Sequence, residues 1–248
     1  MKVLQSCSAL FLLILIISFS GCDKNEGVTA HHLNFISRVP VNVPEASGLA
    51  VFNSEMYLTV SDSLSKVYLI GLDGKLIRSL SFTGENLEGV TYDPALAIIF
   101  VVEEKDNSII KLDTSGAELG RMSIPLENTD PKHGLEGITF NPNTGSLYVV
   151  SEMDPAYLFE IATDGTILAK HELSFAEDYS SVFYEPIENA LWILSEDSQS
   201  LTKTTFEGNP LATYQTGIQN GEGVIVDIKS SRVYIITDSS SSFCTLSF

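Results

Sequence analysis

The sequence has little positive charge. Its 248 residues include 14 lysines and arginines against 32 aspartates and glutamates, which gives a formal net charge of −18. A protein that binds nucleic acid needs a basic surface for the phosphates, so this class of function is excluded. The same deficit disfavours contact between the folded domain and an anionic membrane surface. Cations and cationic partners are the natural counterparts of this chain.

Cysteine and histidine are also scarce. The chain has three cysteines and four histidines, and two of the cysteines, Cys7 and Cys22, stand near the N-terminus. An exported domain left with Cys22 and Cys244 does without a disulfide framework. No Ser-His-Asp order, nucleotide-binding glycine loop or paired-cysteine motif is present in the sequence.

The long apolar run of the chain lies at its beginning. Lys2 precedes the apolar stretch 9–19, and the run ends in Ser-Gly-Cys at Cys22. The run is too short for a membrane-spanning helix, and small residues before a cysteine resemble a bacterial lipobox. We therefore expect a signal peptide over residues 1–21, a lipidated Cys22 that anchors an exported protein to a membrane of the cell envelope, and a tether over residues 22–33. The alternative is ordinary secretion with a free Cys22.

The remaining residues, 34–248, contain five copies of one unit. The first shared feature is a short apolar motif of the type Leu-Glu-Gly-Val-Thr, which is most similar in the copies at Asn86 and Gly134. The motif positions are Ser47, Glu88, Glu136, Ser180 and Glu222. These positions are separated by 41, 48, 44 and 42 residues. A period of this length is typical of a β-propeller rather than of a solenoid.

Each copy continues with a second β-rich segment and then a hairpin. The second segments are 57–62, 99–104, 147–152, 191–196 and 233–238, and they are apolar on both faces, as inner strands are. Trp192 occupies a core slot in one of them. Two further strands joined by an Asp/Glu-Gly type turn complete a four-stranded antiparallel blade. The fifth copy has three strands, so we expect Asn34–Val43 to complete it and close a five-bladed, all-β propeller.

The whole mature chain, with its "LEGVTYDP" and "LEGITFNP" units and its lipoprotein-like start, resembles the SdiA-regulated family of exported bacterial proteins. The resemblance implies a five-bladed propeller that is distantly similar to NHL-repeat propellers. It also implies a calcium ion at a site shared within the family. It implies no defined biochemical activity.

The acids of the two segments fall at a regular spacing. The acid that ends the second segment follows the motif position by 15 residues in the first copy and by 16 in the other four. Because two hairpin strands return the chain to the same rim, both positions should lie on one face of the disc. The second set is Asp62, Glu104, Glu152, Glu196 and Asp238. We expect the motif positions to form an inner ring and the second set a wider ring around it.

Eight crowded carboxylates need a neutralising partner, because close like charges raise their pKa. Calcium accepts several oxygen ligands in flexible geometry. Both rings lack histidine and cysteine, which disfavours zinc and copper. We expect Glu88, Glu136 and Glu222 to bind Ca²⁺, with Ser47 and Ser180 adding oxygens or water. The acids of the wider ring would contribute to calcium binding. The alternative is that these acids are simply solvated at the rim of the disc, which would give the same spacing in the sequence.

Three functions fit such a site. The first is an exported, monomeric binding or scaffold module, with a protein or small-molecule partner that the sequence does not identify. The second is a calcium-dependent hydrolase of the lactonase or esterase kind, in which His133 is the candidate base near Glu136. The third, phosphate-ester chemistry, is set aside because the expected rim offers few basic residues besides Lys105 and Lys132.

Overall fold

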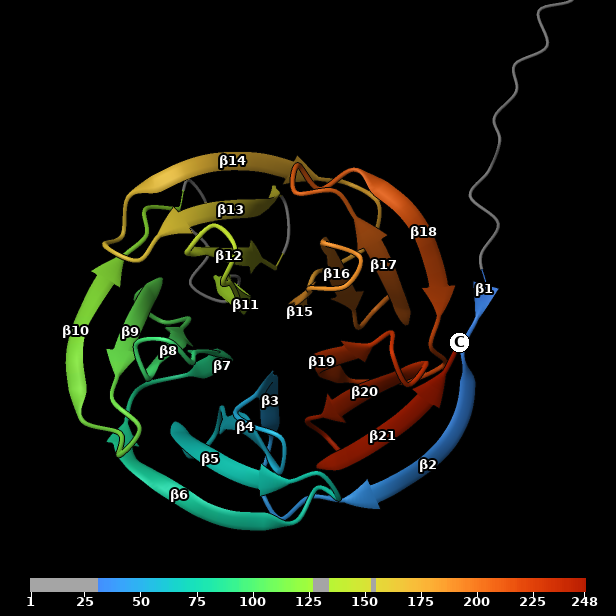
Figure 1. Cartoon of the computed structure of the whole chain (residues 1–248), viewed down its shortest axis with the longest axis horizontal. Coiled ribbons are helices and arrows are strands. Elements are labelled where there is room, and N and C mark those ends of the chain that lie inside the picture. The colour runs from blue at the N-terminus through green and yellow to red at the C-terminus, as the bar shows by residue number, and fades with distance from the viewer. Residues whose placement is uncertain (1–30, 127–133, 153–154) are drawn as a thin grey trace, which may run out of the picture.

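The computed structural model describes residues 31–126, 134–152 and 155–248. Within these residues all regular structure is β, with 21 strands in five sheets. Figure 1 shows the sheets arranged as blades around a central axis. The chain is therefore a five-bladed β-propeller, which confirms the prediction from the repeats. Among the residues described, none forms a helix of the length and apolarity that crossing a bilayer requires.

Three blades are built from consecutive strands in the order predicted. Blade 1 contains β3 (Ala46–Val51), β4 (Met56–Ser61), β5 (Lys66–Gly71) and β6 (Leu76–Thr83). Blade 2 contains β7 (Leu87–Asp93), β8 (Ile98–Glu103), β9 (Ser108–Leu112) and β10 (Glu118–Ser123). Blade 3 contains β11 (Leu135–Asn141), β12 (Ser146–Ser151), β13 (Ala156–Ala162) and β14 (Ile167–Leu173). In each blade the first strand lies nearest the axis and the fourth forms the outer edge.

The last two blades receive strands from the beginning of the described chain. Blade 4 contains β15 (Ser181–Glu185), β16 (Ala190–Ser195), β17 (Ser200–Thr204) and β18 (Pro210–Gln215). Blade 5 contains β19 (Gly221–Asp227), β20 (Arg232–Thr237), β21 (Ser242–Ser247) and, as its fourth strand, β2 (Asn34–Pro40). Asn34 pairs with Ser247 in antiparallel register. The predicted closure of the ring is therefore present, although β2 ends at Pro40 rather than at Val43.

One additional contact joins the N-terminal segment to blade 4. The two-residue strand β1 (His31–His32) pairs in parallel with β18, and Leu33 donates a backbone hydrogen bond to Gln215 O. Leu33 is also buried among the apolar residues between blades 4 and 5. Residues 31–33 thus pack on the propeller, whereas the sequence placed them in the tether.

The hydrophobic core is divided into five clusters, one between each pair of adjacent blades. The apolar second strands contribute to these clusters from both faces, as their sequences predict. Trp192 is 1% exposed and packs between blades 4 and 5, which confirms that it is a core residue. The blades are held together by side-chain packing, so ring closure buries surface that an open arc would leave exposed.

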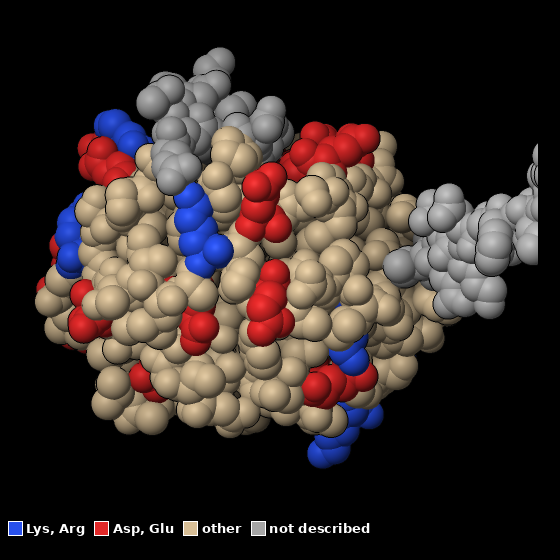
Figure 2. Space-filling model, turned by 90° about the horizontal axis from the view of Figure 1, so that it is seen from above, with Lys and Arg blue, Asp and Glu red and all other residues tan. Residues whose placement is uncertain are grey.

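The outer strands present charge and a few exposed apolar side chains to solvent. Acidic side chains outnumber basic ones over the side of the disc seen in Figure 2. Each fourth strand has a β-bulge that leaves one aliphatic residue at least 46% exposed. These residues are Ile36, Ile77, Leu119, Leu168 and Leu211. Such bulges interrupt the pattern of an exposed strand edge and so disfavour pairing with another chain.

Candidate functional site

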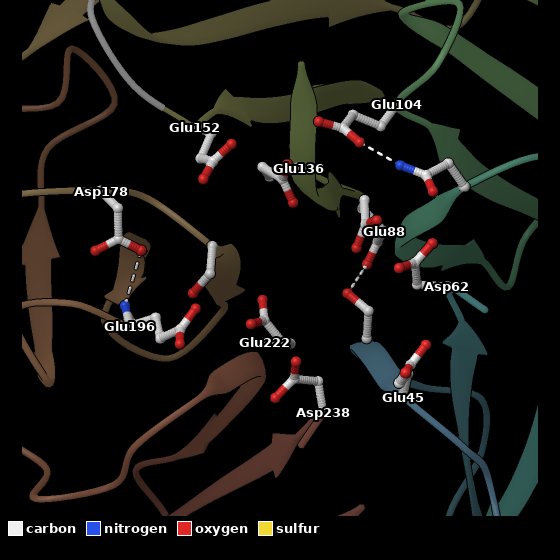
Figure 3. Close-up of a pocket in the computed structure, with 13 residues that line it drawn as sticks. Glu45, Asp62, Glu88, Glu104, Glu136, Glu152, Asp178, Glu196, Glu222 and Asp238 are labelled. Atoms are coloured by element: carbon white, nitrogen blue, oxygen red, sulfur yellow. Dashed lines mark hydrogen bonds between the residues drawn. The ribbon is translucent and has the colours of Figure 1, made fainter. Parts of the chain in front are cut away.

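The motif that opens each blade places its glutamate or serine beside the axis. In blades 1, 2, 3 and 5 the pairing of the first two strands shifts register at this motif. A bulge of this kind turns a side chain away from the regular alternation of a strand. Figure 3 shows Glu88, Glu136 and Glu222 pointing from their strands toward the common space at the axis.

The glycine that follows the motif acid allows the first strands to approach one another closely. A Cβ atom on Gly89 would lie 2.4 Å from Glu136 O, and one on Gly223 would lie 2.6 Å from the backbone carbon of Gly48. Only glycine permits such a contact without a shift of the backbone. The Glu-Gly pair therefore has two purposes: glycine brings neighbouring blades together, and the acid faces the axis.

All ten ring positions predicted from the sequence line a single cavity of about 400 Å³ at one mouth of the axial channel. The motif positions Ser47, Glu88, Glu136, Ser180 and Glu222 contribute from the first strands or the residues just before them. Asp62, Glu104, Glu152, Glu196 and Asp238 contribute from the ends of the second strands. We call this cavity the acidic mouth. Hairpin geometry explains the result, because two successive strands bring the chain back to the same rim.

The closest group of carboxylates differs from the one that the sequence suggested. Oxygens of Glu104, Glu136 and Glu152 lie within 4.8 Å of one another. The sequence favoured Glu88, Glu136 and Glu222, all from the inner ring. Within the described residues, the acids that form this group with Glu136 are instead Glu104 and Glu152, which directly follow the second strands β8 and β12 of blades 2 and 3.

Glu136 differs from the other buried acids in its hydrogen bonding. Glu103 is 3% exposed and receives Arg121 Nη1 at 2.6 Å and Glu85 N at 2.8 Å. Asp93, Glu104, Asp178 and Glu185 also accept hydrogen bonds. Glu136 is 8% exposed, yet no donor among the described residues reaches its carboxylate. A buried carboxylate without a partner is costly unless it is protonated or bound to a cation.

Burial and like charge both act on the acids of this mouth. Burial, followed by Asp62 and Glu104, raises the pKa of Glu88 to about 8. Burial, followed by Glu88, raises the pKa of Glu136 well above its ordinary value. Burial and the neighbouring Glu196 do the same to the pKa of Glu222. Without a cation the innermost carboxyls of this mouth favour their protonated forms, and a divalent cation would favour loss of those protons.

The two serines of the inner ring connect neighbouring blades. Ser47 Oγ donates to Glu88 O at 2.6 Å, and Ser180 Oγ donates to Gly221 O at 2.7 Å. The Ser47 hydroxyl thus donates a hydrogen bond from blade 1 to blade 2, and the Ser180 hydroxyl donates one from blade 4 to blade 5. The serine oxygens still line the cavity, where they can act as acceptors.

Three further residues that the sequence did not predict line the acidic mouth, namely Glu45, Asn86 and Asp178. Each stands two positions before the motif residue of its blade. Asn86 and its counterpart Asn220 adopt φ values of 56° and 54°, and their side-chain amides donate to Glu104 and Glu196. Asparagine is favoured in this left-handed conformation. Its recurrence before the motif is the signal that could have identified this layer.

Other predicted positions lie outside the described residues. These are Cys22 with the signal peptide, and also Lys132 and His133. Among the residues that line the acidic mouth in the described chain, none is histidine, lysine or arginine. Cys244 is a buried free cysteine, whose sulfur accepts a hydrogen bond from Arg38 Nε at 3.2 Å.

Comparison with known proteins supports the fold. A family model described as SdiA-regulated matches residues 37–244. No curated protein gives a significant match. A solved streptogramin B lyase is 17% identical, with a TM-score of 0.51, and the match covers 85% of this chain and 72% of the lyase. A catalytically inactive virginiamycin B lyase from Staphylococcus aureus with quinupristin is 18% identical, with a TM-score of 0.51 and coverage of 86% and 73%. At such identity the likeness concerns the fold alone.

Proposed function

This chain belongs to the SdiA-regulated family, and from that premise we propose that it is an exported, calcium-binding β-propeller that acts as a binding or scaffold module. The ion would sit at the acidic mouth, with Glu136 as its central ligand. It would neutralise carboxylates from several blades and so hold the ring together. The lipobox-like segment motivates the further proposal that Cys22 anchors the domain to a membrane of the cell envelope.

The observation that carries the calcium proposal is the environment of the Glu136 side chain. Among the acids of the described chain that are 8% exposed or less, each accepts at least one hydrogen bond except Glu136. Its nearest titratable neighbours are carboxylates that raise its pKa further. A divalent cation between these groups would supply positive charge, which none of the described residues lining the acidic mouth carries.

The donor set fits calcium. Two oxygens that both lie 2.3–2.6 Å from an ion can be at most about 4.6–5.2 Å apart. The oxygens of Glu104, Glu136 and Glu152 lie within 4.8 Å of one another. Glu88 and Glu222 line the same cavity and can add charge to the ligand set. All of these ligands are carboxylate oxygens, which calcium prefers. Zinc and copper sites typically include histidine nitrogen or cysteine sulfur.

Isothermal titration calorimetry with the chelator-treated protein tests this proposal. We expect one Ca²⁺ per chain, and Glu136→Gln should weaken binding by at least about tenfold because it removes the central charge. The matched control is Glu172→Gln on the exposed outer strand β14, which should bind calcium as the wild type does. Equal affinities of both variants would mean that calcium is attracted diffusely by the net charge, and the site would have to be abandoned.

The calcium-dependent hydrolase stays an alternative prediction. It depends on His133, which lies outside the described residues. A panel of lactones and carboxylic esters, assayed with calcium present, distinguishes the two functions. Turnover that is lost in His133→Ala while calcium affinity is retained would favour the hydrolase over the binding module.

The anchoring proposal has a separate test. A lipoprotein carries several acyl chains, which suffice for firm membrane attachment. Labelling with a fatty-acid analogue should therefore mark the wild type and not Cys22→Ser. Equal labelling of both proteins would contradict lipidation at this residue and would leave the calcium proposal untouched.

A further inference from the structure

The opposite mouth of the channel contains a second cavity of about 480 Å³. It is built from the ends of the first strands of blades 1 to 4 and from the turns that follow them. Phe52, Tyr92, Phe140 and Phe183 form aromatic parts of its wall. The residues that line it include no aspartate, glutamate, lysine, arginine or histidine. We call this cavity the apolar mouth.

Two buried threonines place polar groups in this mostly apolar wall, which also includes Asn53 and Ser54. Thr91 Oγ1 accepts a hydrogen bond from Phe140 N, and Thr139 Oγ1 accepts one from Tyr184 N, both at 3.0 Å. Each threonine is 5% exposed and lines the cavity. Neither hydroxyl donates a hydrogen bond to another described residue. Each therefore retains one proton for an acceptor that enters the cavity.

The size and chemistry of the cavity restrict what it can hold. Small-molecule sites are typically concave spaces of roughly 300–1,000 Å³ with apolar walls and a few placed polar groups. A charged ligand would lose its hydration without gaining an ion pair, since the lining has no charged side chain. Aromatic walls favour a ring-containing ligand through stacking and edge contacts. The two hydroxyl protons favour a carbonyl or ether oxygen on that ligand.

We propose that the apolar mouth is a binding site for a neutral, ring-containing small molecule that bears a hydrogen-bond acceptor. The aromatic side chains enclose the ring, and the Thr91 and Thr139 hydroxyls donate to the acceptor. This site is separate from the acidic mouth, because the two cavities share no lining residue. Its occupancy therefore does not depend on calcium.

The probe for this proposal is 6-propionyl-2-(dimethylamino)naphthalene, a neutral fluorophore with a ketone acceptor. We expect saturable binding to the full folded chain with a blue-shifted emission. Val51 lines the cavity and is 46% exposed, so Val51→Trp should block the entrance and weaken binding by at least about tenfold. Leu168→Trp is the matched control, because Leu168 is 54% exposed on the outer strand β14. It should bind the probe as the wild type does.

A second variant and a second condition sharpen the test. Thr139→Val keeps the side-chain shape and removes one donor, so it should weaken binding of the ketone probe more than binding of a naphthalene without an acceptor. Calcium or a chelator should leave the probe affinity of the wild type unchanged. The proposal is overturned if binding does not saturate, if Val51→Trp and Leu168→Trp bind equally, or if calcium controls the affinity. The last outcome would assign the probe to the acidic mouth.

Discussion

The acidic and apolar mouths are built by the same strands and have opposite chemistry. Glu88 and Tyr92 lie four residues apart on β7, and Glu136 and Phe140 lie four apart on β11. At about 3.3 Å per residue the two ends of such a strand are separated by about 13 Å. One end collects carboxylates whose pKa values are raised, and the other collects aromatic rings without a charge. A first strand thus contributes to two cavities of different chemistry because its length separates its two ends.

The two mouths also differ in what holds them in shape. At the acidic mouth the backbones of neighbouring blades meet through glycines such as Gly89 and Gly223. At the apolar mouth threonine side chains join one blade to the next. We therefore expect the acidic mouth to be sensitive to substitution of its glycines, to calcium and to pH. The apolar mouth should be sensitive to the loss of polar side chains and insensitive to calcium.

The largest effect is expected from Gly89→Ala. The added Cβ would lie 2.4 Å from Glu136 O, so blades 2 and 3 must separate, at a cost of about 3 kcal/mol in the free energy of unfolding. The control Gly145→Ala has open space around it and only the strain of φ 72°, which should cost about 1 kcal/mol. Chemical denaturation of both variants measures the difference. Equal losses would show that the close approach at the axis is unimportant.

Calcium should produce the next largest effect. A ligand that binds only the folded state at a hundredfold excess over Kd stabilises by about 2.7 kcal/mol. For a chain of this length that corresponds to a rise in Tm of roughly 5–10 °C. Differential scanning calorimetry should show this rise for the wild type and for Val51→Trp, and a much smaller rise for Glu136→Gln. A smaller calcium-induced rise in Tm for Val51→Trp than for the wild type would show that the two mouths are coupled.

In the absence of calcium, stability should fall as the pH rises. The pKa of Glu88 in the folded chain is raised from 4.5 to about 8, and the pKa values of Glu136 and Glu222 are also raised well above their ordinary value. A carboxyl whose folded pKa is raised stabilises fully below its unfolded pKa, and this contribution is lost as pH rises through the folded pKa. Tm should therefore decline between about pH 4.5 and 8, by at least roughly 2–4 °C.

Two measurements check the origin of this decline. Glu136→Gln cannot ionise at that position, so the decline should become shallower in this variant and its calcium-free form should be more stable than the wild type at pH 8. Saturating calcium should also reduce the decline, since the ion replaces the protons. A wild type whose Tm is flat or rises over this range would show that the acids ionise in the folded state without cost.

The smallest effect is expected at the apolar mouth. Thr139→Val removes the acceptor of Tyr184 N and should cost about 1–2 kcal/mol, because a buried donor is left without a partner. Thr83→Val on the exposed part of β6 should be close to neutral. The calcium-induced rise in Tm should be the same in both variants. A loss of calcium response in Thr139→Val would link the two mouths.

The repeats allowed the fold to be predicted from the sequence. The period of 41–48 residues and the alternation of strands and turns are local properties, and they led to five blades and to closure by the segment that begins at Asn34. The placement of Glu88 and Glu104 at one mouth followed from the 16-residue spacing within a hairpin. A repeated pattern of this kind depends little on distant contacts, so it can be read without knowing how the blades pack.

The sequence alone determined that the eight acids of the two predicted rings share a face of the disc, since strand direction and hairpin length decide this within each blade. Only the tertiary structure decided that Glu104 and Glu152 close on Glu136, that Glu136 lacks a hydrogen-bond donor among the described residues, and that the far ends of the same strands enclose an apolar cavity. These properties depend on how closely neighbouring blades approach and how far each blade twists. Both are set by packing between segments some forty residues apart, which no local pattern records.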